Sequence, residues 1–308
     1  MTMNKEKYIK LDYKPDDNTR SELENLNSQK ENLSKFHLNH ANLENINLVE
    51  ATMEKTNLSR ANLKNASMYG INLNGSNLFK TNFENANLNN ADLQNCNLLG
   101  ANLENTKLKN VNWDKNYKVI NEIEAEKAYN NGNIKIAKEK YKEAEDIYRT
   151  IKISMQSQTL GAETGEFFIR EMVARRKQFD KFSVSRIGSK IIELTTGYGE
   201  KLGNIVFTII GIIIACMFLY GIEGVKYGDP INGDRIIGFF TDDMKKFGFL
   251  NTLGNLFYFS VVVYSTVGFG EIIPIGLLGK SIMIFEGIIG GLVLAILIIA
   301  LYKKSMDR

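Results

Sequence analysis

Two short segments of the 308-residue chain share one arrangement of hydroxyl residues, glycines and an acid. Residues 195–200 read TTGYGE, and residues 266–271 read TVGFGE. Glycine at alternate positions permits backbone angles that a residue with Cβ resists. A strand with this freedom can aim successive carbonyl oxygens at one axis, where they replace the hydration shell of a cation. Both segments are therefore candidates for an ion-binding strand, and their surroundings must decide between them.

The sequence around residues 266–271 provides the elements that would position such a strand. Leu202–Ile222 is uncharged and about as long as a bilayer requires, and Ser281–Tyr302 contains one acid. Between these two segments, residues 251–265 read NTLGNLFYFSVVVYS, which is apolar but too short to span a membrane. We therefore expect two membrane spans, a re-entrant helix at 251–265 and the ion-binding strand at 266–270.

Residues 195–200 lack this setting, because basic amphipathic sequence precedes them and a single span follows. We interpret them as a glycine-permitted turn that leads a helix into the first span. The alternative is a second ion-binding strand.

The stretch YSTVGFGEIIP resembles the filter signature TVGYGD of two-transmembrane potassium channels, and the resemblance covers roughly residues 200–304. It implies a selectivity filter that binds potassium through five residues, with ions at the first four: Thr266, Val267, Gly268, Phe269 and Gly270. Ser265 and Glu271 would support the filter. Because one chain supplies one strand of each carbonyl ring, the resemblance also implies a homotetramer. Phe269 and Glu271 replace the tyrosine and aspartate of the family pattern, which leaves filter stability and inactivation open.

The second span carries small residues and one acid. The candidates for gating are the small or apolar residues of this span: Gly287, Gly290, Gly291, Ala295 and Ile299. The three glycines permit either a bend or close helix packing, and both interpretations stay open. The last two residues are alternatives for an inner gate. Glu286 is a rare intramembrane acid, and we expect it to form hydrogen bonds behind the filter rather than to meet ions.

A large apolar residue returns at every fifth position from Leu33 to Trp113, and a small or branched residue often lies two positions before it. This period matches neither a helix nor a strand. It fits a solenoid with four five-residue units per turn, in which two positions of every five point inward. The stretch resembles the pentapeptide-repeat family, which implies a right-handed quadrilateral β-helix, here at residues 29–115. We expect Trp113 to cover the last turn.

The five-residue repeat specifies the fold of this region but indicates little about its function. Some members of the family imitate DNA with a negative surface, but acidic and basic residues nearly cancel between positions 31 and 114. His37 and His40 could bind a metal, although no acid or cysteine cluster joins them, and we expect both at the solvated surface. A partner protein or ligand for the solenoid is possible, and a nucleic-acid partner is not expected.

Two further segments complete the predicted organisation. We expect residues 1–28 to form a flexible lead-in and residues 116–200 to form an α-helical coupling domain. The latter begins with two amphipathic helices at an Asn-Asn-Gly break, similar to one tetratricopeptide-like hairpin, and a third helix follows. The pore domain then takes residues 201–308. The fold class is therefore multidomain: a β-solenoid, a helical linker domain and an all-α membrane domain.

Basic residues crowd before the first span and return after the second, whereas the loop between the spans has few. This distribution places both termini in the cytoplasm of a multi-pass protein of the cell membrane. The net charge of +3 and the two distant cysteines give no sign of a nucleic-acid binder or of a disulfide.

Taken with the resemblance, these features predict a tetrameric channel that conducts potassium passively, with a regulatory or scaffolding solenoid. We expect no enzyme activity and no cofactor other than potassium ions in the pore, because we find no nucleophile–base pair, nucleotide-binding loop or metal-ligand set. Membrane lipid is an expected partner. The alternatives are a weakly selective cation channel and a membrane-anchored scaffold with a silent pore.

Overall fold

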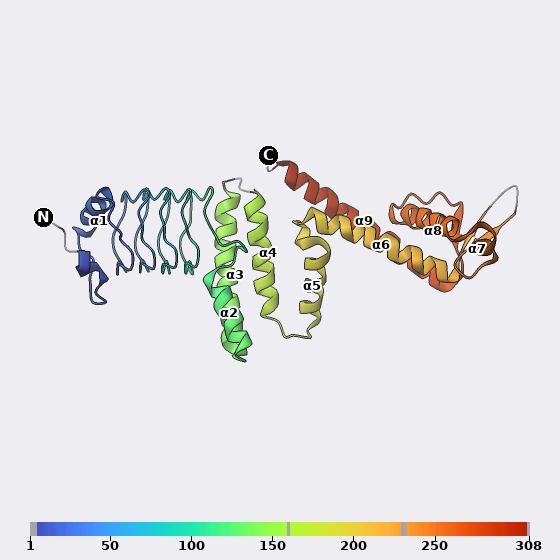
Figure 1. Cartoon of the computed structure of the whole chain (residues 1–308), viewed down its shortest axis with the longest axis horizontal. Coiled ribbons are helices and arrows are strands. Elements are labelled where there is room, and N and C mark those ends of the chain that lie inside the picture. The colour runs from blue at the N-terminus through green and yellow to red at the C-terminus, as the bar shows by residue number, and fades with distance from the viewer. Residues whose placement is uncertain (1–4, 159–160, 229–232, 307–308) are drawn as a thin grey trace. The chain divides into compact units, whose positions relative to one another are not determined.

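The computed structural model describes residues 5–158, 161–228 and 233–306 (Figure 1). The chain divides into two compact units, which meet in sequence between Lys190 and Ile191. The first unit contains a coil of repeated turns with helices at both ends, and the second contains the long apolar helices (Figure 1).

The coil is built from parallel bridges at every fifth position, each of which joins a residue to the one 20 positions further on, from His37 with Asn57 to Asp92 with Asn112. Four five-residue units therefore complete one turn, as the period of five predicts. The large residue of each unit is buried, and so is the small residue two positions before it. At every fifth position the chain turns a corner with positive φ, often at asparagine or glycine, which tolerate this conformation best.

Polar side chains inside the coil bind the preceding turn. The hydroxyls of Thr56, Ser76, Thr81 and Thr106 are fully buried. Each donates to a main-chain carbonyl 23 residues earlier; for Thr81 the acceptor is Leu58, at 2.8 Å. The interior thus satisfies its hydroxyl groups within the column, which limits the cost of burying them.

The expectation that residues 5–28 form a flexible lead-in is wrong. They form a 3-10 helix at Lys5–Ile9 and helix α1 at Thr19–Ser28. Tyr8 is buried and stacks on Phe36 of the first turn, with ring centroids 4.8 Å apart. Its carbonyl also accepts a 2.7 Å hydrogen bond from the N–H of His37. The segment covers the open end of the solenoid, as terminal caps of repeat proteins do.

Helices α3 at Ile134–Gln156 and α4 at Gly161–Lys177 contact the other end of the solenoid, and α2 at Ile120–Asn130 packs against α3 (Figure 1). Trp113 of the last turn meets Phe167 of α4 edge-on, with centroids 5.1 Å apart, and both side chains are buried. Ser154 of α3 donates a 2.9 Å hydrogen bond to the carbonyl of Leu103. Trp113 therefore covers the last turn as predicted, and the helices pair with backbone groups that the end of a solenoid leaves free.

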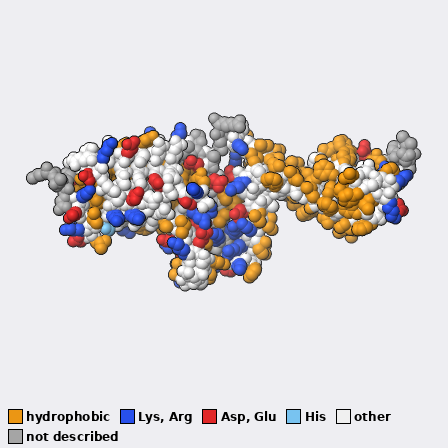
Figure 2. Space-filling view, viewed as in Figure 1, with side chains coloured by type: hydrophobic (Ala, Val, Ile, Leu, Met, Phe, Trp, Pro, Cys, Tyr) orange, Lys and Arg blue, Asp and Glu red, His pale blue; other side chains and the backbone are white. Residues whose placement is uncertain are grey.

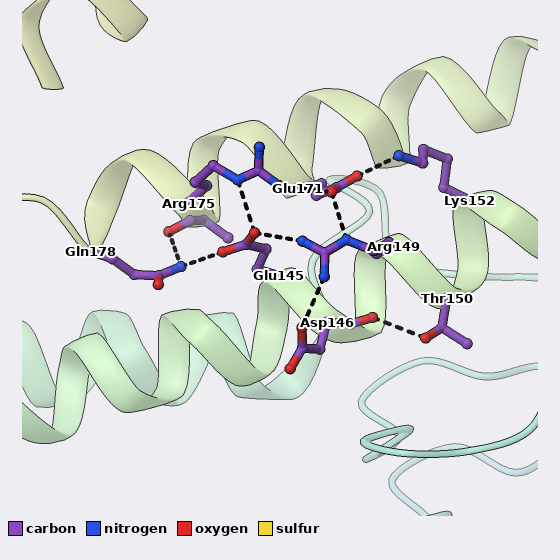
Figure 3. Close-up of polar contacts among 9 residues, drawn as sticks. Glu145, Asp146, Arg149, Thr150, Lys152, Glu171, Arg175 and Gln178 are labelled. Carbon is purple, nitrogen blue, oxygen red and sulfur yellow. Dashed lines mark hydrogen bonds and ion pairs between the residues drawn. The ribbon is translucent and has the colours of Figure 1, made fainter. Parts of the chain in front are cut away.

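An ion-pair network joins α3 to α4 (Figure 3). Glu145 accepts hydrogen bonds from Arg149, Arg175 and Gln178 at 2.7 to 2.9 Å. Glu171 similarly binds Arg149 and Lys152. Burial acts to raise the pKa of Glu145, but the bonds from Gln178 and Arg175 outweigh it and hold that pKa below its usual value. The ionised carboxylate therefore stabilises the packing of α3 on α4.

Helix α5, Val184–Thr196, leads into a tight turn at Gly197–Gly199 and then into α6, Leu202–Glu223. Three successive residues of the turn have positive φ: Gly197 at 56°, Tyr198 at 57° and Gly199 at 84°. TTGYGE is therefore a turn between two helices, as predicted. Beside it, Glu200 pairs at 2.6 Å with Lys303, near the C-terminal end of α9 (Gly276–Met306).

The second unit holds two helices that are long and apolar enough to cross a membrane, α6 and α9, the latter at Gly276–Met306. Between them lie α7 at Asp242–Phe247 and the shorter apolar helix α8 at Phe249–Tyr264. Three short strands, β1 at Val225–Tyr227, β2 at Arg235–Ile237 and β3 at Ile272–Pro274, form an antiparallel sheet in the order β2-β1-β3. The expectation of an all-α membrane domain is therefore wrong in this respect. Hydrophobic side chains cover most of the face that Figure 2 shows of this unit.

Candidate functional site

The candidate ion-binding strand follows directly from α8. The helix buries Thr252, Leu256, Phe259 and Ser260 on one face, with the spacing of an amphipathic helix. Two hydrogen bonds close its C-terminal end: the N–H of Thr266 donates to the carbonyl of Val263 at 3.0 Å, and the N–H of Val267 donates to the carbonyl of Val262 at 3.2 Å. The chain then leaves the helix, and residues 266–271 belong to no helix or sheet strand.

The backbone of this segment alternates in handedness. Thr266 has φ of 59°, Gly268 of 58° and Gly270 of 80°, whereas Val267 and Phe269 are not among the residues with positive φ. Glycine adopts positive φ at little cost, so the two glycines lie where the backbone needs them. A threonine in this conformation is strained and must be held by its surroundings. Alternation of this kind lets consecutive peptide groups face the same side of a strand.

Both ends of the strand are fixed to other elements. After Gly270, strand β3 pairs with β1, which begins directly beyond α6. The carbonyl of Glu271 accepts a 3.0 Å hydrogen bond from the N–H of Gly228. The sheet therefore connects one end of the candidate strand to the first long helix, and α8 holds the other end.

A carboxylate joins the two long helices near the same sheet. Glu223, the last residue of α6, accepts a 2.7 Å hydrogen bond from the N–H of Gly279 in the first turn of α9. An acid at a helix N-terminus satisfies a free N–H group and interacts favourably with the helix dipole. Gly276 has φ of 69°, a conformation that favours glycine, and a Cβ there would lie 2.9 Å from this carboxylate.

Glu286 lies at the contact of three helices. The residue is fully buried in α9. Its Oε1 is 2.5 Å from the hydroxyl of Ser260 in α8, and its Oε2 accepts a 2.8 Å hydrogen bond from Tyr220 of α6. The carboxyl group thus lies beside the helix that leads into the strand, in agreement with the expectation that it would form hydrogen bonds behind it.

The candidate gating residues occupy different surroundings on α9. A Cβ on Gly290 would lie 2.5 Å from the carbonyl oxygen of Tyr264, whereas a Cβ on Gly287 or Gly291 would meet nothing within 4 Å in the described chain. Gly290 is therefore explained by close packing of α9 on the end of α8. Ala295 and Ile299 are exposed on the same helix.

The strand itself is uncovered in a single chain. Val267 is 54% exposed and Phe269 is 64% exposed. An apolar cavity of about 260 Å³ lies beside them, lined among others by Phe269, Ile272 and Met283. Ser265, at the start of the strand, is half-buried and donates a 3.2 Å hydrogen bond to the carbonyl of Val262.

Sequence reasoning missed three residues that organise this unit: Tyr220, Ser260 and Glu223. Each is a polar side chain in or at the end of an apolar helix, and that isolation is the signal that could have found them. The sequence gives no partner for any of them, because the contacts join positions between 26 and 66 residues apart.

Residues 235–304 match the family described as ion channel. Residues 37–75 and 76–112 match pentapeptide repeats, with eight copies. The chain therefore joins a pentapeptide-repeat region to an ion channel domain. This organisation is the one that the two resemblances predict. The channel match includes the candidate strand, and the two long apolar helices of this unit agree with a membrane protein.

Solved structures similar to the chain are pentapeptide-repeat proteins. Rfr23 from the cyanobacterium Cyanothece 51142 is 45% identical, over 28% of this chain and 59% of its own, with a TM-score of 0.28. A pentapeptide repeat protein from Nostoc Pcc 7120 is 29% identical, over 33% of this chain and 82% of its own, with a TM-score of 0.30. The chain thus spans 59% of the length of the cyanobacterial Rfr23. Among curated proteins, none matches the chain.

Proposed function

We propose that the chain assembles into a homotetramer that conducts potassium selectively and passively through filter strands at Thr266–Gly270. The observation that carries this proposal is the alternating backbone at 266, 268 and 270, in a strand that an ion channel domain contains. Potassium is the transported substrate, and transport makes and breaks no covalent bond.

The chemistry is replacement of water by carbonyl oxygens. A potassium ion that enters a narrow pore must lose its hydration shell, and rings of backbone carbonyls supply oxygens in its place. Thr266, Val267, Gly268 and Phe269 would contribute these rings, and the Thr266 hydroxyl would add oxygen at the inner mouth. Gly268 and Gly270 allow the alternation that the rings require. Ser265 and Glu271 would hold the two ends of the filter.

Four copies are needed because one strand supplies a quarter of each ring. The exposure of Val267 and Phe269 in a single chain, and the apolar cavity beside them, support an assembly that covers this face. In that assembly α9 would line the inner cavity. Ala295 and Ile299, exposed on α9, are the candidates for the inner gate.

The orientation places both termini in the cytoplasm and α6 and α9 across the cell membrane. Helix α5 supports this orientation, because it precedes α6 and carries Arg186 and Lys190 beside exposed apolar residues such as Ile187 and Ile191. Basic and apolar side chains together favour the cytoplasmic surface of a membrane, where anionic lipids lie.

The solenoid would serve regulation or scaffolding. We propose that its turns form the right-handed quadrilateral β-helix of the pentapeptide-repeat family, with a protein or ligand as its partner. The parallel bridges at a spacing of 20 residues support four short sides per turn.

Potassium uptake into liposomes tests the proposal. A Gly268→Asp variant places a side chain and a charge where φ is 58°, so we expect uptake to be lost. Gly233→Asp is the matched control, because Gly233 also has positive φ, of 83°, and has nothing within 4 Å of its Cβ position. Unchanged uptake in Gly268→Asp would contradict the assignment of this strand as the filter. No uptake in the wild type would contradict the proposal as a whole and favour a scaffold with a silent pore.

A further inference from the structure

The buried cluster around Glu286 contains more hydrogen-bond contacts than its hydroxyl groups can donate. Ser260 Oγ lies 2.5 Å from Glu286 Oε1 and 2.9 Å from the carbonyl oxygen of Ile213 in α6. Tyr220 donates its hydroxyl hydrogen to Glu286 Oε2. A serine hydroxyl has one hydrogen, and a backbone carbonyl can only accept. One of the two contacts of Ser260 therefore needs a hydrogen from another group.

Glu286 is the group that can supply this hydrogen. If its carboxyl is protonated, Oε1–H donates to Ser260, Ser260 donates to Ile213, and Tyr220 donates to Oε2. All three contacts are then satisfied. If the carboxyl is ionised, Ser260 cannot serve both acceptors, and a contact between buried oxygens is left without a hydrogen.

The absence of a nearby positive charge in the described chain also favours a protonated carboxyl group on Glu286. Within the described residues, no lysine or arginine forms an ion pair with Glu286. The titratable groups that face it are Cys216 and Tyr220 from α6 and Tyr264 from α8, and none of them is a cation. A carboxylate buried among apolar helices without a cation is costly, whereas a protonated carboxyl that donates to Ser260 and accepts from Tyr220 is not.

We infer that Glu286 is a positioning residue, held as an uncharged carboxylic acid, that fixes α8 against α6 and α9. Ser260 lies in α8 shortly before the candidate strand begins at Thr266, so the cluster sets where that strand starts. Gly290, one turn further along α9, packs on the carbonyl of Tyr264 at the end of the same helix. The effect on conduction rests on the proposed function; the protonation state and the effect on stability do not.

Infrared spectroscopy of the purified full-length protein at pH 7.5 tests the protonation state. We expect the carbonyl stretch of a protonated carboxylic acid in the wild type, its loss in Glu286→Gln, and its retention in Asp242→Asn. Asp242 is the control because its side chain is 96% exposed and pairs with Lys245. A wild-type spectrum without this band, or a band that survives in Glu286→Gln, would overturn the inference.

Rescue by glutamine tests the positioning role. The amide of glutamine can donate to Ser260 and accept from Tyr220, so Glu286→Gln should keep potassium uptake and a thermal midpoint within about 2 °C of the wild type. Glu286→Leu leaves both hydroxyls without their partner, so we expect uptake to be lost and the midpoint to fall by about 5 °C or more. Equal damage in the two variants, or none in Glu286→Leu, would refute the role. If the wild type conducts no potassium, the infrared band and the midpoints still decide the inference, whereas the proposed function fails.

Discussion

Substitution of Gly290 by alanine tests how closely α9 packs on the end of α8. An added Cβ would lie 2.5 Å from the carbonyl oxygen and 3.2 Å from the carbonyl carbon of Tyr264. Both atoms belong to the backbone of the residue that ends α8, so they cannot swing aside as a flexible side chain can. The helices must separate, or the chain must shift just before the candidate strand.

The size of the effect follows from the contact distance. An ordinary contact of Cβ begins near 3.4 Å, so the neighbouring backbone must move by 3.4 − 2.5, which is 0.9 Å. Overpacking of this kind costs about 1–3 kcal/mol. Alanine also favours the helix over glycine by about 0.8–1.0 kcal/mol. Gly291→Ala gains the same helix preference without a contact, so the difference in unfolding free energy between the two variants isolates the overpacking cost.

Thermal or denaturant unfolding of the purified protein in detergent gives this difference. We expect Gly290→Ala to be less stable than Gly291→Ala by about 1–3 kcal/mol. Potassium uptake should fall in Gly290→Ala if the proposed function holds, because the displaced segment ends at Ser265, immediately before the candidate strand. If Gly290→Ala is as stable as Gly291→Ala, then close packing does not explain Gly290, and the hinge interpretation gains support.

Two further predictions concern the first unit. Glu145→Gln should lower the free energy of unfolding at pH 7, because the pKa of Glu145 is lowered in the folded protein. The carboxylate therefore contributes stability above its unfolded pKa of about 4.3, and this contribution is lost as the pH falls through the folded pKa. The chain has one tryptophan, Trp113, and its fluorescence follows unfolding of this unit. If the stability difference between Glu145→Gln and the wild type persists undiminished at pH 3, the ionised carboxylate of Glu145 is not its cause. Trp113→Ala should cost about 3–5 kcal/mol, because it empties the contact with Phe167 at the end of the solenoid. Circular dichroism in urea measures this cost, and a midpoint equal to that of the wild type would show that the tryptophan does not hold the end closed.

The regular parts of the fold could be predicted because their signal repeats or is local. The period of five predicts the turns of the solenoid, and the glycines at 197 and 199 predict the tight turn between α5 and α6. The N-terminal cap could not be found this way, since the burial of Tyr8 depends on contacts with distant residues, among them its stacking on Phe36 of the solenoid. A single aromatic residue in polar sequence carries no periodicity.

The candidate site also contains residues that the sequence predicts and residues that it does not. The glycine spacing of the candidate strand is visible in the sequence, and Glu286 is conspicuous as an acid in an apolar segment. Its partners Tyr220 and Ser260 are not visible, because hydroxyl residues are common and only the packing of three helices brings these two together. The same holds for Glu223, whose role depends on where α9 begins.

Reversal potentials measured with the purified protein in a planar bilayer test the central claim most directly. With potassium on one side and sodium on the other, carbonyl rings from four copies of Thr266–Gly270 predict a reversal potential far from zero, with the sign set by potassium. A reversal potential near zero would show that the pore does not distinguish the two ions, and would contradict the assignment of this strand as a potassium filter.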